Sequence, residues 1–486
     1  MTSHRFPLRR SSTIQGNVLA GFNKPHQAFV FLTFDGRDRA RQWLAGLAPQ
    51  VTSTADVADF RARRRAAAPG QAPSAVWVNL GLTASGLRIL LDLGRDPGLA
   101  ASLRSYRAFW AGPTGNRPDE AFRPTWALLG DAGGDGPANW VVGGRNTQAV
   151  DALLTVAADD EAGLDAMLGE LRAAAAALRV SVAWEQRGRR LVGPDDPTTS
   201  REPFGFADGI SQPGIRGFTP ATVRDGREED AGHPGTRIVA AGEFVLGMEP
   251  QPGPADPPDG PPEPPPWMQH GSFQVFRRLT QDVDGWLAHT RELAGRHFPA
   301  GPDDVVAAKA VGRWRSGAPL ALEPERPRGG PRNDFGYADD REGFKTPRFA
   351  HTRKTNPRDD DPGADSHRIL RRGIPFDDPP ERGLLFNAYM ANIKRQFEYI
   401  QWRWANDPRF PAGKLDPPGS TTSDGADPVI SPSAGPCLLR RPGPPAERLE
   451  LDLRRFVRTT GAVYAFAPSV PALAWLAEGT PRSRRA

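Results

Sequence analysis

The chain has 486 residues, a formal net charge of +5 and a single cysteine, Cys437. Its length exceeds what one hydrophobic core usually supports, so two domains or one duplicated unit are expected. One cysteine excludes an intrachain disulfide framework and any cysteine-based zinc or iron–sulfur site. A metal ligand must therefore come from histidine or from a carboxylate.

The charge pattern also restricts the partners. Arginines are interleaved with acidic residues rather than collected in one run, which is not the pattern of a nucleic-acid-binding surface. No uncharged apolar run approaches the ~18 residues of a membrane-spanning helix. The pair Arg9–Arg10 is followed by polar residues between positions 11 and 17, where an export signal would be apolar. We expect a cytoplasmic protein that binds neither nucleic acid nor a membrane.

The first half of the chain alternates strands with helices. Segments 28–34 and 75–82 are rich in β-branched and aromatic residues and predict buried strands. A helix rich in Ala and Arg is expected after the first strand, and Thr83 fits the N-cap of a helix after the second. Residues 150–186 predict a strand, a long Ala-rich helix and another strand. This order favours an α+β fold in which helices cover one face of a mostly antiparallel sheet.

The regular pattern stops between residues 202 and 242, which indicates a domain boundary. Strands are expected at 242–248 and 271–279, and the proline tract at 249–267 between them must be a surface loop. A helix is expected at 282–293.

Residues 326–348 are expected to form a loop. Residues 383–407 predict a strand that runs into an amphipathic helix, with Ile393, Phe397 and Ile400 on its apolar stripe. Segments 449–457 and 461–468 alternate like two paired strands, and Pro471 precedes a short helix. The second half thus repeats the rhythm of the first, although no repeat of individual residues is visible.

Three segments could carry chemistry. The stretch GFADGIS, residues 205–211, places Asp208 in a glycine-framed turn, although Asp-Gly alone is more typical of an ordinary turn. His351 opens the basic stretch HTRKTNPR, although a lone histidine is more often a structural hydrogen-bonding residue. Twenty residues later Arg371 and Arg372 precede the turn Gly-Ile-Pro at 373–375, which would hold a guanidinium in a fixed orientation.

Together these segments resemble the dye-decolorizing peroxidases. GFADGIS matches their GxxDG motif, HTRKTNPR resembles their proximal-histidine segment, and ILRRGIPF resembles their distal-arginine segment. The resemblance extends through IQGNVLAGF, GEFVLGM, GSFQVFRRL, GLLFNAYMANIKRQFEYIQ and YAFAPSVPAL, and the insertions around the proline tract resemble the longer-chain branch of the family.

The resemblance implies an α+β fold with two ferredoxin-like domains, a duplicated antiparallel sheet of the dimeric α+β barrel type. The expected N-terminal domain spans residues 1–215 and ends with the GxxDG turn. The expected C-terminal, haem-binding domain spans residues 216–486 and includes the proline-rich loop 249–267.

The resemblance further implies one haem b per chain, with His351 as the iron ligand and with Asp208 and Arg371 as catalytic residues. A neutral imidazole supplies one strong axial ligand and leaves the other haem face open for hydrogen peroxide. A carboxylate can move a proton between the two peroxide oxygens. A guanidinium keeps its positive charge at every working pH and can stabilise the departing oxygen.

The remaining haem contacts also follow from the resemblance. Arg371 is chosen over Arg372 because the family pattern places the distal guanidinium two residues before the position of Gly373. Arg372 is expected to face a haem propionate or solvent. Gly209, Ile210 and Phe386 are expected to contact the haem, and His367 is the next candidate ligand if His351 is not the one used.

Family members place an acidic residue behind the ligating histidine, where it raises the basicity of the imidazole. Asp407 is the candidate for this role, with Glu398 as the alternative. Oxidation of bulky donors at a surface aromatic residue is often proposed for the family, and Tyr389, Trp402 and Trp404 lie in the corresponding region. Core packing is the favoured interpretation for these three aromatic residues.

The leading functional hypothesis is a haem peroxidase that reduces hydrogen peroxide and takes single electrons from phenolic or dye-like aromatic donors. One alternative is a related haem reaction, such as peroxygenation, hydrolytic dye cleavage or the release of iron from haem by a deferrochelatase. Another is a haem carrier or sensor without catalysis, which is disfavoured because transport needs no acid–base pair beside the haem. The sequence leaves open the natural donor and the oligomeric state, a homo-oligomer included.

Overall fold

The computed structural model describes residues 7–479 except 69, 92–105, 116–123, 194–195, 220, 225–226, 231, 233, 253–262, 413–422, 433–434 and 444–446. Its main feature is a nine-stranded sheet with the strand order β12-β14-β11-β17-β2-β3-β1-β4, in which β13 also pairs with β14. Each of these pairs is antiparallel.

Both halves of the chain contribute strands to this sheet. The first half supplies β1 (His26–Thr33), β2 (Val76–Leu82), β3 (Ala152–Ala158) and β4 (Ser181–Arg189). The second half supplies β11 (Ser272–Gln281), β12 (Leu370–Arg371), β13 (Ile374–Asp378), β14 (Glu381–Met390) and β17 (Val457–Ala467). The two sets join where Leu82 pairs with Phe466. The division into residues 1–215 and 216–486 stays a prediction.

The sheet curls until its end strands meet. Gln186 of β4 donates a hydrogen bond of 2.5 Å to Asp378 of β13. The rings of Phe29 and Phe31 in β1 each lie 5.0 Å from the ring of Phe276 in β11. Because β1 and β11 are not neighbours in the strand order, these contacts cross the inside of the curved sheet. The expected α+β class with an antiparallel barrel-type sheet is therefore confirmed.

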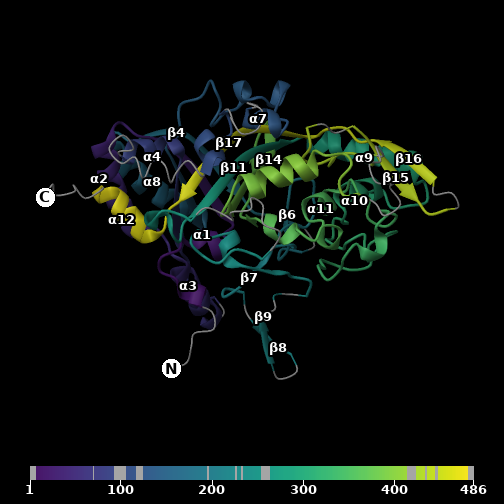
Figure 1. Cartoon of the computed structure of the whole chain (residues 1–486), viewed down its shortest axis with the longest axis horizontal. Helices are drawn as coiled ribbons and strands as arrows, with labels where there is room; N and C mark the ends of the chain where they lie inside the picture. The colour runs from purple at the N-terminus through teal and green to yellow at the C-terminus, as the bar shows by residue number, and fades with distance from the viewer. Residues whose placement is uncertain are drawn as a thin grey trace.

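Helices cover the outer face of the first-half strands. They are α2 (Arg37–Leu47), α4 (Ala84–Leu90), α8 (Glu161–Ala177) and the C-terminal α12 (Val470–Glu478), and they lie at one end of the molecule (Figure 1). The helix α8 buries Leu164, Leu168, Leu171 and Ala175, which recur at the helical period. Thr83 caps α4 as expected, because its side chain accepts a hydrogen bond from the backbone N–H of Gly86.

The opposite end of the molecule contains α9 (Val283–His297), α10 (Val305–Val311), α11 (His351–Thr355) and the hairpin of β15 (Pro436–Arg441) and β16 (Glu447–Asp452) (Figure 1). These elements surround a second core that includes Trp286, Trp314, Phe204 and Phe206. The two phenylalanines flank Gly205 at the start of the GFADGIS turn, so this core anchors the turn to the second half of the chain.

Two predicted strand arrangements are wrong. Residues 242–248 form a short 3-10 turn at Ala241–Glu243 and further turns, because Gly247 has a φ of +80° and the chain folds back on itself. Phe244 and Val245 of this segment are buried in a small cluster and Leu246 in the main core, instead of alternating along a strand. Segments 449–457 and 461–468 do not pair with each other, since β16 pairs with β15 and β17 pairs with β11 and β2.

The helix predicted after β14 is present but has π-helical geometry, over Lys394–Glu398 and Ile400–Ala405. Its apolar stripe is buried as predicted: Ile393, Phe397 and Ile400 are 2%, 5% and 8% exposed. Most of the proline tract lies outside the described residues.

The other α-helices and strands are α1 (Gly16–Leu19), α3 (Thr54–Ala66), α6 (Arg107–Ala111), α7 (Thr125–Leu128), β5 (Leu191–Val192), β6 (Ser200–Arg201), β7 (Gly214–Ile215), β8 (Ala221–Arg224), β9 (Arg227–Asp230) and β10 (Ile238–Val239). Among the described helices, none has both the length and the apolar character needed to cross a membrane.

Candidate active site

A cavity of about 600 Å³ lies where the GFADGIS turn, the strands β12 and β14, the helix α11 and the loop after Asp427 meet. Its size is typical of a site for a small molecule or cofactor. Seven residues proposed from the sequence line it: Asp208, Gly209, Ile210, His351, Arg371, Arg372 and Phe386. The fold therefore brings together three segments that are far apart along the chain.

His351 is the first residue of α11, and its ring orientation is fixed by one hydrogen bond. Its Nδ1 lies 2.8 Å from Oδ2 of Asp427, a carboxylate with no exposed surface. Oδ1 of the same carboxylate accepts hydrogen bonds from the backbone N–H groups of Val429 at 2.8 Å and Ile430 at 3.1 Å. Because Nδ1 is used by Asp427, Nε2 is the ring nitrogen left for a ligand in the cavity.

The acid behind His351 is thus neither Asp407 nor Glu398, and both predictions are corrected. The carboxylate of Asp407 accepts a hydrogen bond from the backbone N–H of Arg409 at 3.0 Å. The carboxylate of Glu398 is 3.2 Å from the hydroxyl of Tyr464. Sequence reasoning missed Asp427 because it stands 76 residues after His351, in a Gly- and Pro-containing loop whose only local signal is that of an ordinary turn.

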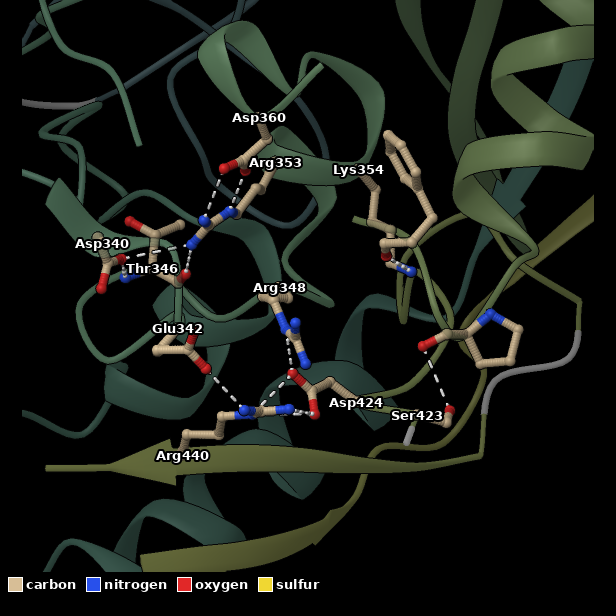
Figure 2. A network of polar contacts seen from close by, with 12 residues as sticks. Asp340, Glu342, Thr346, Arg348, Arg353, Lys354, Asp360, Ser423, Asp424 and Arg440 are labelled. Carbon is tan, nitrogen blue, oxygen red and sulfur yellow. Dashed lines mark hydrogen bonds and ion pairs between the residues drawn. The ribbon is translucent and has the colours of Figure 1, made fainter. Parts of the chain in front are cut away.

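Buried ion pairs hold the loop that carries Asp427 (Figure 2). Arg348 binds the carboxylate of Asp424, and Arg440 binds the same carboxylate at 3.1–3.2 Å. Arg440 also donates to Glu342 at 2.8 Å. Because Asp424 precedes Asp427 by only three residues, these contacts restrict the movement of the histidine's hydrogen-bond partner.

Two basic side chains of α11 itself are also buried (Figure 2). Arg353 binds Asp360 through two bonds of 2.7 and 3.1 Å. Lys354 donates to the backbone carbonyl of Asp407 at 2.6 Å and to that of Phe410. Burial lowers the pKa of Lys354 to about 8. The short helix that presents His351 is therefore fastened on both sides by charged groups.

Asp208 occupies a constrained turn on another wall of the cavity. The flanking Gly205 and Gly209 have φ values of +92° and +78°, which favour glycine. The backbone N–H of Asp208 donates to the carbonyl of Ser200 at 2.8 Å, and Oδ1 accepts from the N–H of Gly209 at 2.6 Å. Oδ2 has no hydrogen bond to any residue in the described part of the chain, so it can act on a molecule in the cavity.

Arg371 is joined directly to the same turn. Its guanidinium donates to the backbone carbonyl of Ser211 at 3.3 Å. The side chain of Gln212 pairs with the backbone of Arg371, accepting from its N–H at 3.3 Å and donating to its carbonyl at 3.0 Å. No carboxylate among the described residues forms an ion pair with Arg371, so its positive charge is available in the cavity.

Arg372 has a different role from the one predicted. Its guanidinium donates to the backbone carbonyls of Asn17, Val18 and Leu19 at 2.9–3.0 Å, which fastens α1 to the sheet. Burial lowers its pKa to about 10. It also packs so closely on Gly21 that a Cβ there would lie 2.7 Å from its Nε. Nη1 donates to the carbonyl of Arg371 at 3.1 Å, so most of the N–H donors of Arg372 are used by the backbone rather than left for a haem propionate.

Further arginines that sequence reasoning did not propose for the site line the cavity, among them Arg313, Arg358 and Arg368. The hydrogen bonds of these three go to backbone carbonyls and to side-chain oxygens of Asn333 and Asn356, and none of the three forms an ion pair within the described residues. Burial, together with neighbouring guanidinium groups, lowers the pKa of Arg313 and of Arg368 to about 10. Together, these three arginines could bind carboxylates. They stand in different segments of the chain, so the sequence did not indicate that they share a site.

The donor set fits a haem. One imidazole has its Nδ1 anchored and its Nε2 free, and the cavity also contains a cationic edge for two carboxylates. Apolar walls are formed by Leu384, Phe386, Phe397 and Ile400, and the rings of Phe386 and Phe397 lie 5.8 Å apart. A planar, largely apolar macrocycle with carboxylate side chains matches this combination.

The other candidate residues lie outside the immediate site. His367 stacks on Tyr399 with a ring separation of 3.9 Å and is not among the residues that line the cavity. Tyr389 and Trp404 are buried at 1% and 2% exposure, in agreement with core packing. Trp402 is partly exposed and lies 3.8 Å from the guanidinium of Arg403.

An α+β barrel that places an anchored histidine, a carboxylate and a guanidinium in one cavity defines a site of the haem-peroxidase class. Comparison with known proteins agrees with this. Residues 13–189 match the DyP dimeric alpha+beta barrel domain, and residues 260–410 match the Dyp-type peroxidase C-terminal domain. The chain belongs to the DyP-type peroxidase family, whose members bind haem.

Relatives match over most of the chain. It is 31% identical to the multifunctional dye peroxidase DyP2 of Amycolatopsis sp., over 87% of this chain and 85% of that protein. It is 29% identical to Peroxidase 2 of Mycetinis scorodonius, over 95% and 86%. A dye-decolorizing peroxidase solved in complex with 2,6-dimethoxyphenol has 26% identity and a TM-score of 0.74, covering 97% of this chain and 99% of that one.

Proposed function

We propose that this protein is a haem b-dependent peroxidase that reduces hydrogen peroxide and oxidises phenolic or dye-like donors in one-electron steps. The observation that carries the proposal is that His351, bound through Nδ1 to Asp427, lines the same cavity as Asp208 and Arg371. The names of the relatives and the phenol bound by one structural neighbour support this donor class.

One haem b per chain would be held by Nε2 of His351, by apolar contacts with Phe386 and Ile210, and by Arg313 and Arg368 at its carboxylates. When bound, the haem iron would transfer electrons from the donors to peroxide. The buried Asp427 keeps the proton of His351 on Nδ1 and so leaves Nε2 as the donor atom.

Asp208 would handle the proton. Its free Oδ2 takes a proton from one oxygen of hydrogen peroxide and returns it to the other oxygen, which departs as water when the O–O bond breaks. Arg371, held by Ser211 and Gln212, stabilises the negative charge that develops on the departing oxygen. Over one cycle, each of two donor molecules gives one electron. These two electrons and two protons convert one hydrogen peroxide into two waters.

Steady-state oxidation of 2,6-dimethoxyphenol by the haem-loaded protein, with and without peroxide, tests the proposal. We expect a Soret band that saturates at one haem per chain and donor oxidation that requires peroxide. His351→Ala should lose most of the haem. Haem binding without any peroxide-dependent oxidation would support a carrier or sensor, and product formation without peroxide would support another haem reaction.

A further inference from the structure

Glu202, a second carboxylate that lines the cavity, has no role in the steps described above. It lies three residues before Gly205 and six before Asp208. Its side chain is only partly buried because it faces the cavity.

The contacts of Glu202 converge on the turn that carries Asp208. Oε2 accepts a hydrogen bond from the backbone N–H of Phe204, and Oε1 accepts one from the N–H of Phe206, both at 3.0 Å. A third donor, Nε2 of Gln281 in β11, lies 3.0 Å from Oε2. The backbone of Glu202 adds two bonds, accepting from Gly205 at 2.8 Å and donating to Phe206 at 3.0 Å.

Residues 204–206 are therefore held from two sides. On one side the ring of Phe204 stacks on Trp286, with centroids 4.7 Å apart, and Phe206 is buried in the same core. On the other side the carboxylate of Glu202 binds both backbone N–H groups. A side chain that occupies two amides of a short turn fixes the path of the backbone into the next residues, here Ala207 and Asp208.

The charge of Glu202 also acts inside the cavity. Burial raises the pKa of the Glu202 carboxyl and the charge of Asp208 raises it further, while the bonds from Phe204, Phe206 and Gln281 partly offset both. Arg315, from the segment after α10, is a further charged group that interacts with Glu202. Negative charge on Asp208 therefore disfavours negative charge on Glu202, and the same repulsion acts in the other direction.

We propose that Glu202 is a positioning residue for Asp208: its carboxylate holds the turn that directs Asp208 into the cavity, and its negative charge tunes proton uptake there. The proposal rests on the proposed peroxidase function only for the second part, the tuning of proton uptake. The first part, the holding of the turn, is a property of the fold and can be measured without turnover.

Amide hydrogen exchange of the protein as purified tests the holding of the turn. In Glu202→Gln an amide NH₂ replaces one carboxylate oxygen, so one of the two backbone N–H groups loses its acceptor. We therefore expect at least ~10-fold faster exchange in peptides covering residues 203–209. Glu243→Gln is the matched control, because the carboxylate of Glu243 also accepts from a backbone N–H, that of Gln251, but does not line the cavity. The control should leave residues 203–209 unchanged.

Cyanide binding to the haem-loaded protein tests the effect of charge without turnover. Hydrogen cyanide must give up its proton as it binds, so the pH profile of its association rate reports on the proton acceptor in the cavity. Removing the charge in Glu202→Gln should shift the midpoint of this profile to lower pH by at least ~0.5 unit. Glu202→Asp keeps the charge but cannot reach both amides, so it should speed exchange with a smaller shift of the profile.

The outcomes are distinct. Unchanged exchange at residues 203–209 in both Glu202 variants would overturn the positioning role, whatever the enzyme does. Faster exchange with superimposable pH profiles would overturn the tuning of proton uptake. If Glu202→Gln does not fold, Glu202→Asp still decides the exchange experiment. If the wild type binds no haem, the peroxidase proposal fails while hydrogen exchange still judges the positioning role.

Discussion

Asp427 fixes the orientation of the His351 ring through a single hydrogen bond. Its second oxygen is bound to the backbone N–H groups of Val429 and Ile430, so the carboxylate cannot rotate away. A carboxylate in this position makes Nε2 a better electron donor to a metal. We therefore expect haem affinity to depend on a residue that stands behind the ligating histidine.

Asp427→Asn is expected to lower haem affinity by ~10- to 100-fold, because a neutral amide polarises the imidazole less than a carboxylate does. Titration of the protein with haem, followed at the Soret band, measures the change. Asp407→Asn is the control, since its carboxylate has no bond to His351. If Asp407→Asn weakened haem binding and Asp427→Asn did not, the assignment would be wrong.

Substitution of Arg372 and of Arg313 should distinguish an arginine that stabilises the fold from one that binds the cofactor. Arg372→Leu leaves the carbonyls of residues 17–19 without their donor, so we expect it to lower the free energy of unfolding by about 2–3 kcal/mol. Arg313→Leu should instead weaken haem binding. Urea unfolding and haem titration of both variants give the comparison, and a large loss of haem affinity in Arg372→Leu alone would restore the role first predicted for it.

The residues that make up the site were predictable to different degrees. His351, Asp208 and Arg371 stand in motifs whose order and spacing resemble a family, and the fold places all three in one cavity. Asp427 and Arg313 could not be predicted in the same way. They stand in loops that come near the site only through tertiary packing, and their neighbours in the sequence predict only turns.

At the scale of elements, hydrophobic pattern predicted the helices on the first half of the sheet and its strands except β12 and β13, because the sequence at Ile374 and Pro375 predicts a tight turn. The hydrophobic pattern did not predict which strands pair, because pairing is decided by tertiary structure. The segments 449–457 and 461–468 each alternate correctly, yet β16 and β17 belong to different sheets. The helix after β14 has its predicted apolar stripe, but a stripe of that width does not distinguish an α-helix from a π-helix.

The helix α11 depends on the buried Lys354, which makes its stability sensitive to pH. The pKa of this lysine is about 8 in the folded protein against an ordinary value of 10.5, so the unfolded chain binds the proton more tightly between those values. The stability due to this group is therefore present above pH 10.5 and is lost as pH falls through about 8.

Comparison of wild type with Lys354→Met tests this dependence. The difference in the free energy of unfolding, wild type minus variant, should grow by about 1–3 kcal/mol between pH 7 and pH 10. Urea unfolding at the two pH values measures it. Lys345→Met, at an exposed neighbouring lysine, is the control and should follow the wild type. A difference that stayed constant or shrank with pH would contradict the burial of a titrating lysine.

At the scale of the whole molecule, the curved sheet brings the two halves of the chain together around one cavity. The GFADGIS turn comes from the first half and is anchored in the core of the second, while His351 and Arg371 come from the second half. The α+β class followed from alternating strands and helices. The closure of the sheet did not, because it depends on contacts such as Gln186 with Asp378 between residues 192 positions apart.

The most direct test of the peroxidase function is the rate at which haem-loaded protein consumes one equivalent of hydrogen peroxide in stopped-flow mixing. Asp208→Asn removes the proton acceptor and Arg371→Leu removes the fixed positive charge. We predict that each slows the reaction by at least ~10²-fold while the haem spectrum before mixing stays that of the wild type. Near wild-type rates in Asp208→Asn with haem fully bound would contradict the account and leave GFADGIS as an ordinary turn.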